Sequence, residues 1–326
     1  MTTYKEINGT NIEAVSSDPS NPILGQVWYN TTDNVVKGLG YIASSSWATG
    51  GALNSARYGP GGAGTSNSLA LVFGGFPNGP TAATELYNGT SWTEVNDLNH
   101  GRGYIPGVGT TTAALTFGGN SATTALDTRT ETYNGTSWTE VNNLNTGRYN
   151  IAGAGTQTSS LAIGGYAGSG VANVESWNGT SWTETTDINT ARYGNGGSGA
   201  SNTSALTFGG GPPGTFAATE LWNGSSWTEV NDLTTGRRNL GSAGITATAA
   251  LAFAGQDPYT TKTETWNGTS WTETNDMSVA RVSLAGAGPS TSAIAAGGYD
   301  GTAAPFNNET EEWTGVGPVT FTFTDS

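Results

Sequence analysis

The chain contains no cysteine, which excludes disulfide bonds and thiolate metal sites. It has one histidine, His100, and charged residues make up only 11% of its 326 positions. There is no apolar run long enough to span a membrane and no long segment with helical periodicity. The first residues lack the apolar core of a secretory signal, so we expect neither export by the general secretory route nor membrane insertion.

The charge that is present is strongly unbalanced. Acidic residues outnumber basic residues by 25 to 11, which gives a formal net charge of −14. A surface of this kind repels phosphate backbones, so we do not expect nucleic acid among the partners. The same charge favours solubility when many copies are close together.

Glycine is the most conspicuous residue that the chain does contain, with 50 positions, and aromatic residues contribute 10%. This composition argues against a disordered polyelectrolyte. It fits many short strands joined by tight turns, and we therefore predict an all-β fold.

The segment Asn-Gly-(Thr/Ser)-Ser-Trp-Thr-Glu occurs five times and defines a repeat of about 45 residues. The sequence pattern of each repeat predicts four short strands, which we call A to D, with Gly-Gly at the end of strand B. Asn-Gly between strands C and D predicts a type I′ hairpin turn, which needs positive φ at both central residues. The tryptophans of the five segments are Trp92, Trp138, Trp182, Trp227 and Trp271.

Two charged positions recur six times in step with the repeat. The arginines before strand A are Arg57, Arg102, Arg148, Arg192, Arg237 and Arg281. The glutamates of strand C, each two residues before a Tyr or Trp, are Glu85, Glu131, Glu175, Glu220, Glu264 and Glu311. A ring of arginines could bind an anion, but glutamates recurring in step favour structural ion pairs or bonds to backbone. The strand-D tryptophans likewise have two interpretations, sugar-stacking platforms or packing between repeats, and identical repetition favours packing.

Together, the Gly-Gly pair, the strand-C aromatic, the strand-D tryptophan and the arginine before strand A resemble the kelch repeat. Kelch repeats are the blades of β-propellers that include the central domain of galactose oxidase. The resemblance covers roughly residues 41–315 and implies a propeller with four-stranded blades.

The two ends of the repeat region complement each other. No strand-D tryptophan follows Trp313, whereas an additional one, Trp47, lies ten residues before Arg57. We therefore predict that residues 45–53 supply strand D to the last repeat, which closes a ring of six blades and removes exposed sheet edges.

Candidate binding residues lie where the repeat is irregular. Because chain direction alternates within a blade, the B–C and D–A loops share one face, and loops on a rigid scaffold commonly carry binding sites. The B–C loops contain aromatic residues beside Asn and Asp, which suits sugar rings, although unconstrained loops also drift in sequence. The candidates are Phe76, Tyr166, Phe216, Asp257, Tyr259, Tyr299, Asp300 and Phe306.

The D–A loops repeat an acidic turn at Asp97, Asp232 and Asp276. Calcium takes six to eight oxygen ligands, and one Asp per loop does not supply them. We expect these residues to cap Asx turns, and we expect no metal or cofactor.

Enzymatic chemistry finds little support in the residues. Copper chemistry of the galactose-oxidase type needs histidine ligands and a cysteine–tyrosine crosslink, and this chain has neither a second histidine nor a cysteine. The segment Asn-Gly-Thr-Ser-Trp partly resembles the sialidase Asp-box, but Tyr or Trp fills the position of its Asp. We therefore predict a protein without catalytic residues.

The terminal segments lie outside the repeat. The run Gly-Gln-Val-Trp-Tyr-Asn at residues 25–30, with Lys-Gly at 37–38, predicts a small hairpin and resembles a segment of bacteriophage tail-fibre and other virion proteins. Residues 318–324 alternate strictly, as a strand does, and could pair with this hairpin or with a neighbouring subunit. We favour the neighbour slightly, because both tails lie beyond the ring.

These observations predict an anchoring segment at 1–40, a six-bladed kelch-like propeller at 41–315 and a C-terminal strand at 316–326. The leading hypothesis is a non-enzymatic bacteriophage virion protein, tail-fibre-like or particle-decorating, made in the host cytoplasm. It would contact other virion proteins through residues 1–40 and 316–326, associate with further copies of itself, and present its loop face to a host-surface glycan. The alternatives are a free lectin-like carbohydrate-binding propeller and, behind it, a glycan hydrolase.

Overall fold

The computed structural model describes residues 12–20, 22, 25–42, 44–212, 214–302 and 306–323. Within these ranges the protein is all-β, and no helix there has the length and hydrophobicity needed to cross a membrane. The chain forms two compact units, Ser46–Thr314 and a smaller one made of Met1–Ser45 with Gly315–Ser326. The first residues of the expected anchoring segment, 1–11, and residues 324–326 of the tail lie outside the described residues.

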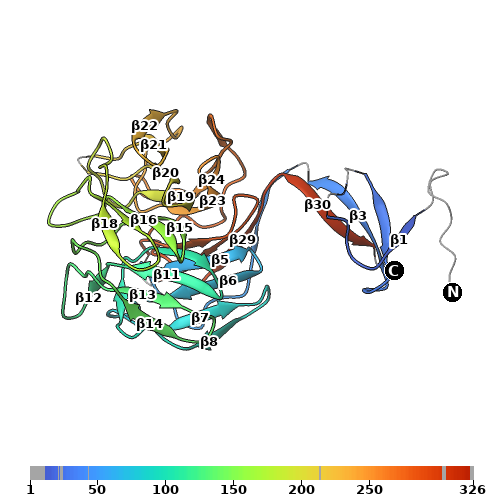
Figure 1. Cartoon of the computed structure of the whole chain (residues 1–326), viewed down its shortest axis with the longest axis horizontal. Helices are drawn as coiled ribbons and strands as arrows, with labels where there is room; N and C mark the ends of the chain where they lie inside the picture. The colour runs from blue at the N-terminus through green and yellow to red at the C-terminus, as the bar shows by residue number, and fades with distance from the viewer. Residues whose placement is uncertain are drawn as a thin grey trace. The chain divides into compact units, whose positions relative to one another are not determined.

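The described part of the larger unit contains six four-stranded antiparallel sheets, which we number as repeats 1 to 6 (Figure 1). Repeats 1 to 3 are β5 (Gly61–Ser66), β6 (Leu69–Phe73), β7 (Thr84–Tyr87), β8 (Trp92–Val95); β10 (Gly107–Thr110), β11 (Ala113–Phe117), β13 (Thr130–Tyr133), β14 (Trp138–Val141); and β15 (Ala152–Thr156), β16 (Ser159–Ile163), β17 (Val174–Trp177), β18 (Trp182–Glu184). Repeats 4 to 6 are β19 (Gly196–Ser201), β20 (Ser204–Phe208), β21 (Thr219–Trp222), β22 (Trp227–Val230); β23 (Gly241–Thr246), β24 (Ala249–Phe253), β25 (Thr263–Trp266), β26 (Trp271–Glu273); and β27 (Ala285–Ala287), β28 (Ser292–Ala296), β29 (Thr310–Thr314), β4 (Ser46–Thr49). In repeat 2, β9 (Arg102–Gly103) also pairs with β12 (Asn120–Ser121).

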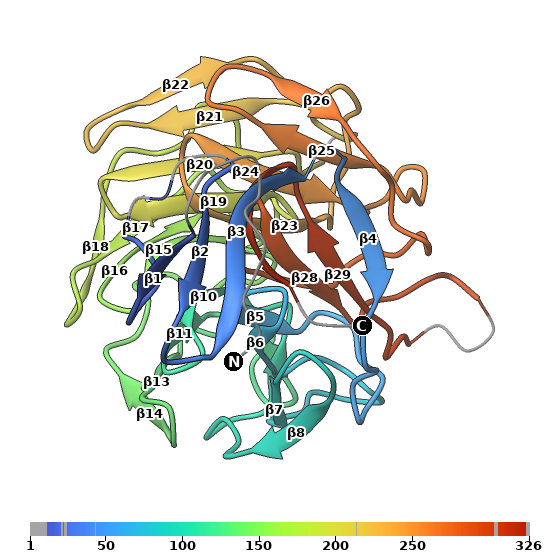
Figure 2. The same cartoon turned by 90° about the vertical axis from the view of Figure 1, so that its right-hand side faces the viewer.

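The last sheet combines the two ends of this unit. Strand β4 pairs antiparallel with β29, and Trp47 lies opposite Trp313 (Figure 2). The N-terminal strand thus occupies the position that strand D holds in the other five sheets.

The strands follow from their residues. Strand B of each repeat is a short apolar run whose last four residues are buried, as in β6 and β16. Strand A is rich in Gly, Ala and Ser and lies toward the middle of the unit, whereas β8, β14, β18 and β22 lie at its periphery (Figure 1). Small side chains suit strand A, because a Cβ at Gly62 would lie 2.8 Å from the carbonyl oxygen of Gly286 in the neighbouring sheet.

The turn between strands C and D differs from the predicted type I′ hairpin. Tyr87 pairs directly with Trp92, so the loop has four residues rather than two. Only its glycine, Gly89, has positive φ, at 92°. The Asn88 side chain caps the loop by accepting from the amides of Thr90 and Ser91, at 2.9 and 3.0 Å, which removes the need for left-handed geometry at Asn88.

Two sets of backbone hydrogen bonds connect the sheets. In the first, the second glycine of each Gly-Gly pair donates to the arginine carbonyl of the next repeat: Gly75 to Arg102, Gly119 to Arg148, Gly165 to Arg192, Gly210 to Arg237, Gly255 to Arg281 and Gly298 to Arg57. In the second, six residues with left-handed backbone each donate to their counterpart in the preceding repeat, at 2.7–3.0 Å: Gly59, Tyr104, Asn150, Gly194, Asn239 and Ser283. Both sets connect repeat 6 back to repeat 1, since Gly298 donates to Arg57 and Gly59 donates to Ser283.

The core lies between neighbouring sheets, and the strand-D tryptophans form much of it. Those of repeats 1 to 5 are only 5–6% exposed. Trp138 donates to the Thr84 hydroxyl of repeat 1 and packs edge-on against Phe73, with ring centroids 4.8 Å apart. Because an indole buries about 150–250 Å², such a contact stabilises the fold by at most about 4–6 kcal/mol. Because so little of each indole is exposed, no ring face is available for a sugar to stack on, and these tryptophans serve in packing between sheets.

The smaller unit is one sheet in the order β1 (Glu13–Val15), β2 (Val27–Asn30), β3 (Val35–Ile42) and β30 (Gly317–Phe323). Strands β2 and β3 form the expected hairpin. The side chain of Asp18 accepts from Asn30, Trp28 and Lys37, and these hydrogen bonds lower its pKa to about 2. Of the two partners considered for the C-terminal strand, the structure shows the N-terminal hairpin and not the slightly favoured neighbouring subunit, since β30 pairs with β3 of the same chain along seven residues. The short link after β29 brings it to the one edge of β3 that β2 leaves open.

Asn195 is a buried polar residue at a position that is apolar in the other repeats, where Pro60, Ile105, Ile151, Leu240 and Leu284 stand. Its amide nitrogen donates to Thr207 at 2.8 Å, but its Oδ1 has no partner. Thr207 donates to the Gly196 carbonyl and therefore cannot satisfy that oxygen.

We predict that Asn195→Leu raises the melting temperature, because an unsatisfied buried polar group costs about 1–3 kcal/mol. At about 2–4 °C per kcal/mol for a unit of this size, the shift should be readily seen by calorimetry. The reciprocal variant Leu240→Asn, in repeat 5, should lower it. A lower melting temperature for Asn195→Leu would show that the asparagine is needed there.

Candidate functional site

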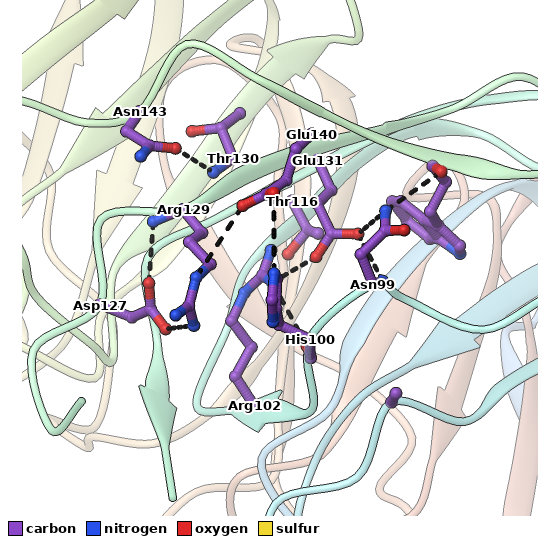
Figure 3. A network of polar contacts seen from close by, with 12 residues as sticks. Asn99, His100, Arg102, Thr116, Asp127, Arg129, Thr130, Glu131, Glu140 and Asn143 are labelled. Carbon is purple, nitrogen blue, oxygen red and sulfur yellow. Dashed lines mark hydrogen bonds and ion pairs between the residues drawn. The ribbon is translucent and has the colours of Figure 1, made fainter. Parts of the chain in front are cut away.

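Every in-phase arginine forms a buried ion pair with the strand-C glutamate of its own repeat, as Figure 3 shows for Arg102 and Glu131. The separations include 3.0 Å for Arg148–Glu175 and 2.6 Å for Arg192–Glu220. The complete set is Arg57–Glu85, Arg102–Glu131, Arg148–Glu175, Arg192–Glu220, Arg237–Glu264 and Arg281–Glu311. These side chains are at most 3% exposed.

The second carboxylate oxygen of each glutamate is also used. It accepts from the backbone amide three residues before the arginine, for example from Asn189 to Glu220 at 2.7 Å. Burial lowers the pKa of Arg192, while the carboxylate of Glu220 opposes the shift, and an arginine remains protonated under these conditions. The arginines are therefore structural and do not form an open anion site.

Repeat 2 adds further charged groups beside this pair (Figure 3). Arg129 contacts Asp127 at 2.8 Å and Glu140 at 3.9 Å, and His100 lies 3.6 Å from Glu140. His100 occupies a position that is Ser, Thr or Val in the other repeats, and it forms part of a surface polar network.

The acidic turns of the D–A loops bridge strands instead of capping their own loops. Asp97 accepts from the backbone amide of Thr84, and Asp232 does the same with Thr219. The expected Asx-turn cap is therefore replaced by a bond to the first residue of strand C. Among the described residues, no group of three or more His, Asp or Glu side chains could hold a metal ion.

The loop face is built on one pair of positions that each repeat supplies. The residue after the arginine pairs with the residue after Gly-Gly: Tyr58 with Phe76, Gly103 with Asn120, Tyr149 with Tyr166, Tyr193 with Gly211, Arg238 with Gln256 and Val282 with Tyr299. Both positions are anchored by the inter-repeat hydrogen bonds next to them, while their identities vary. The backbone pairing is thus the same in every repeat, whereas the side chains at these two positions differ from repeat to repeat.

Aromatic side chains at these positions and in the adjoining loops form one connected group, which we call the aromatic arc. Its ring centroids are 5.0–6.4 Å apart from neighbour to neighbour. The members are Tyr58, Phe76, Tyr104, Tyr149, Tyr166, Tyr193, Tyr259, Tyr299 and Phe306. From Tyr193 in repeat 4 the contacts run through repeats 3, 2 and 1 to repeat 6 and end at Tyr259 in repeat 5.

The rings are partly buried against one another but remain accessible, and Tyr259 is 43% exposed. Burial raises the pKa of Tyr104, with Tyr58 contributing further, and burial also raises that of Tyr149. These hydroxyls are therefore neutral at ordinary pH and can both donate and accept hydrogen bonds.

A polar group fills the gap between the two ends of the arc. Arg238 contacts Asp257 at 2.9 Å. The side-chain amide of Gln256 can form hydrogen bonds with its neighbours only when its oxygen faces Arg238, 3.1 Å from Nε. Asp300 follows Tyr299. Partial burial acts to raise the pKa of Asp300, but hydrogen bonds from Thr302 and Asn307 hold it below its usual value.

The structure brings most of the candidate residues together. Phe76, Tyr166, Tyr259, Tyr299 and Phe306 belong to the aromatic arc, and Asp257 and Asp300 both act electrostatically on Tyr259. Phe216 lies on its B–C loop, half-buried and outside the arc.

Sequence reasoning missed the four members of the arc that come from the D–A loops, namely Tyr58, Tyr104, Tyr149 and Tyr193. A signal was present, because Tyr directly follows an in-phase arginine at Arg57, Arg148 and Arg192. A tyrosine beside a scaffold residue looks structural until the cross-strand pairing shows where it lies.

A central cavity of about 160 Å³ is lined by strand A of all six repeats and by the left-handed residues at its rim. Its walls are mostly glycine, alanine and serine. Tyr104 lines this cavity and also belongs to the aromatic arc.

No protein-family model and no curated protein matches the sequence. Among solved structures, the one described as "Structure of YjhT", a kelch-like propeller, superposes with a TM-score of 0.66. The match covers 82% of this chain and 99% of that chain at 12% identity. Identity this low speaks to fold alone, and it supports a β-propeller.

We predict that Tyr104→Phe makes stability less sensitive to alkaline pH. The raised pKa means that folding favours the neutral phenol; this contribution is complete below the ordinary pKa of 10.0 and disappears as pH rises toward the folded-state value. Urea unfolding at pH 8, 10 and 11 should show a smaller loss above pH 10 in the variant. Identical slopes would mean that Tyr104 ionises as freely in the folded protein as in the unfolded chain.

Proposed function

We propose that this chain is a non-enzymatic, six-bladed β-propeller that binds a glycan on its aromatic arc and is carried on a bacteriophage particle. The particle position could be tail-fibre-like or decorating, and the smaller unit, which contains residues 25–38 and the C-terminal strand, provides the attachment.

Six blades and a closed ring are supported by the hydrogen bonds between repeats. Gly298 of repeat 6 donates to Arg57 of repeat 1 at 2.8 Å, with the same geometry as the other five links. Strand β4 completes the sixth sheet with residues from the start of the repeat region. In this arrangement the two ends of the larger unit share one blade, which ties the ring together.

The aromatic arc is the observation that carries glycan recognition. A sugar ring has an apolar face that packs on an aromatic ring and hydroxyls that need hydrogen-bond partners. The arc offers several tyrosines, each of which combines an aromatic ring with a hydroxyl. Arg238, Asp257 and Gln256 add polar groups at its ends. Recognition residues of this kind on rigid, backbone-anchored positions bind with little ordering cost.

The carboxylates beside the arc support binding without turnover. Hydrolysis of a glycoside usually needs one carboxyl group with a raised pKa as general acid. Asp257 is engaged by Arg238, and the pKa of Asp300 is held low. The environment of Asp300 therefore does not favour a protonated acid near neutral pH.

We predict that Tyr149→Ala and Tyr166→Ala each weaken glycan binding by about twofold to tenfold, because one aromatic contact contributes about 0.5–1.5 kcal/mol and 1.4 kcal/mol corresponds to a factor of ten. Binding would be measured on a glycan array and quantified by calorimetry with the best ligand. Phe216→Ala is the matched control, since it removes a loop-face ring outside the arc. Retention of full affinity in both arc variants, or release of reducing ends by the wild type, would contradict the proposal.

We predict that a truncated chain comprising residues 46–314 folds as a propeller and retains glycan binding but does not join the particle. This segment keeps every strand of the six sheets, whereas it lacks the complete smaller unit. Circular dichroism would confirm folding, and purified virions from cells that express the truncated form would be assayed for the protein. Normal incorporation of the truncated chain would refute attachment through the smaller unit.

A further inference from the structure

The charges of the described residues limit which glycans the aromatic arc can accept. The chain has eleven lysines and arginines. Lys5 lies outside the described residues, and each of the others forms an ion pair with Asp or Glu. On the described surface, every lysine or arginine that an acidic ligand could approach is therefore already paired with a carboxylate.

Arg238 is the cation that lies at the arc itself. It stands at the ring position that Tyr58, Tyr149 and Tyr193 occupy in their repeats. Its charge is balanced by Asp257 at 2.9 Å, and its Nε also contacts the amide oxygen of Gln256. An acidic sugar at Arg238 would lie beside the carboxylate of Asp257, in a protein whose net charge of −14 already repels it.

For a cationic amino sugar, the two carboxylates beside the arc are already partly used within the protein. Asp257 is matched by Arg238. The carboxylate of Asp300 accepts from the backbone amide of Thr302 at 2.9 Å, so its hydrogen-bonding capacity is partly used within its own loop. What remains for recognition is the set of aromatic faces, the neutral tyrosine hydroxyls and the polar atoms of the Arg238–Asp257 pair.

We infer that the aromatic arc binds an uncharged glycan, and that the Arg238–Asp257 pair determines specificity by binding sugar hydroxyls. The guanidinium donates to one hydroxyl and the carboxylate accepts from a neighbouring one, while the rings of the arc pack against the sugar faces. This inference rests on the proposed glycan recognition and names its ligand class.

The test compares three probe classes on full-length protein: oligosaccharides of neutral hexoses, of uronic acids and of glucosamine. Each is measured at 50 and 500 mM NaCl with the wild type, Arg238→Gln, Tyr166→Ala and the control Phe216→Ala. We expect binding to neutral oligosaccharides whose dissociation constant changes less than about twofold with salt, because no net charge is neutralised. Arg238→Gln should weaken it about tenfold and Tyr166→Ala by about twofold to tenfold, and Phe216→Ala should not.

The outcomes separate this inference from the proposed function. Preferred binding of uronic acid or glucosamine oligomers, weakened by salt and by Tyr166→Ala, would overturn the uncharged ligand class and leave arc-mediated glycan recognition standing. Neutral binding unaffected by Arg238→Gln would overturn the role of the ion pair. Absence of arc-dependent binding in all three classes would overturn both the inference and the proposed function.

Discussion

Each repeat depends on one buried arginine that is held in two directions. The guanidinium of Arg192 donates to Glu220 and to the Ala218 carbonyl within its own sheet, and its backbone carbonyl accepts from Gly165 of the preceding sheet. A charge at this depth is tolerated only where several partners satisfy it, and loss of one partner leaves the other uncompensated. The same residue therefore joins the strands of one sheet and joins that sheet to the next, which makes the position difficult to vary.

The residues beside this link are in the opposite situation. The backbone of Tyr193, directly after Arg192, pairs with Gly211 of its own repeat and is flanked by two residues that bond to neighbouring repeats, but its side chain fills no core position. In the corresponding place repeat 2 has Gly103 and repeat 5 has Arg238, so the scaffold accepts very different side chains there. A rigid backbone combined with free choice of side chain suits a recognition surface, because the binding groups are positioned before the ligand arrives.

Most of the scaffold could be predicted from the repeat in the sequence, because the strands, the Arg–Glu pairs and the tryptophans recur with the same residue types. The left-handed residues that link the repeats could not be predicted, because their residue types do not recur: Gly59, Tyr104 and Asn150 share a backbone conformation but no side-chain property. The turn after strand C was assigned the wrong geometry because Asn-Gly suits both a two-residue turn and a four-residue loop capped by Asn88. Four of the nine arc members were missed because they lie one or two residues after scaffold arginines, and only pairing across strands shows which face they share.

The way this protein uses charge connects its folding to the specificity that we propose. Six of its eight arginines lie inside the sheets, matched one to one by glutamates, so the acids that remain unmatched determine the field outside. The cation at the aromatic arc, Arg238, is neutralised by Asp257. A scaffold that uses its basic residues internally leaves recognition to ring faces and hydroxyl groups, which act over short distances and are insensitive to salt. Under the proposed glycan recognition, selectivity comes from shape and from the order of side chains around the arc, where each repeat contributes a different pair.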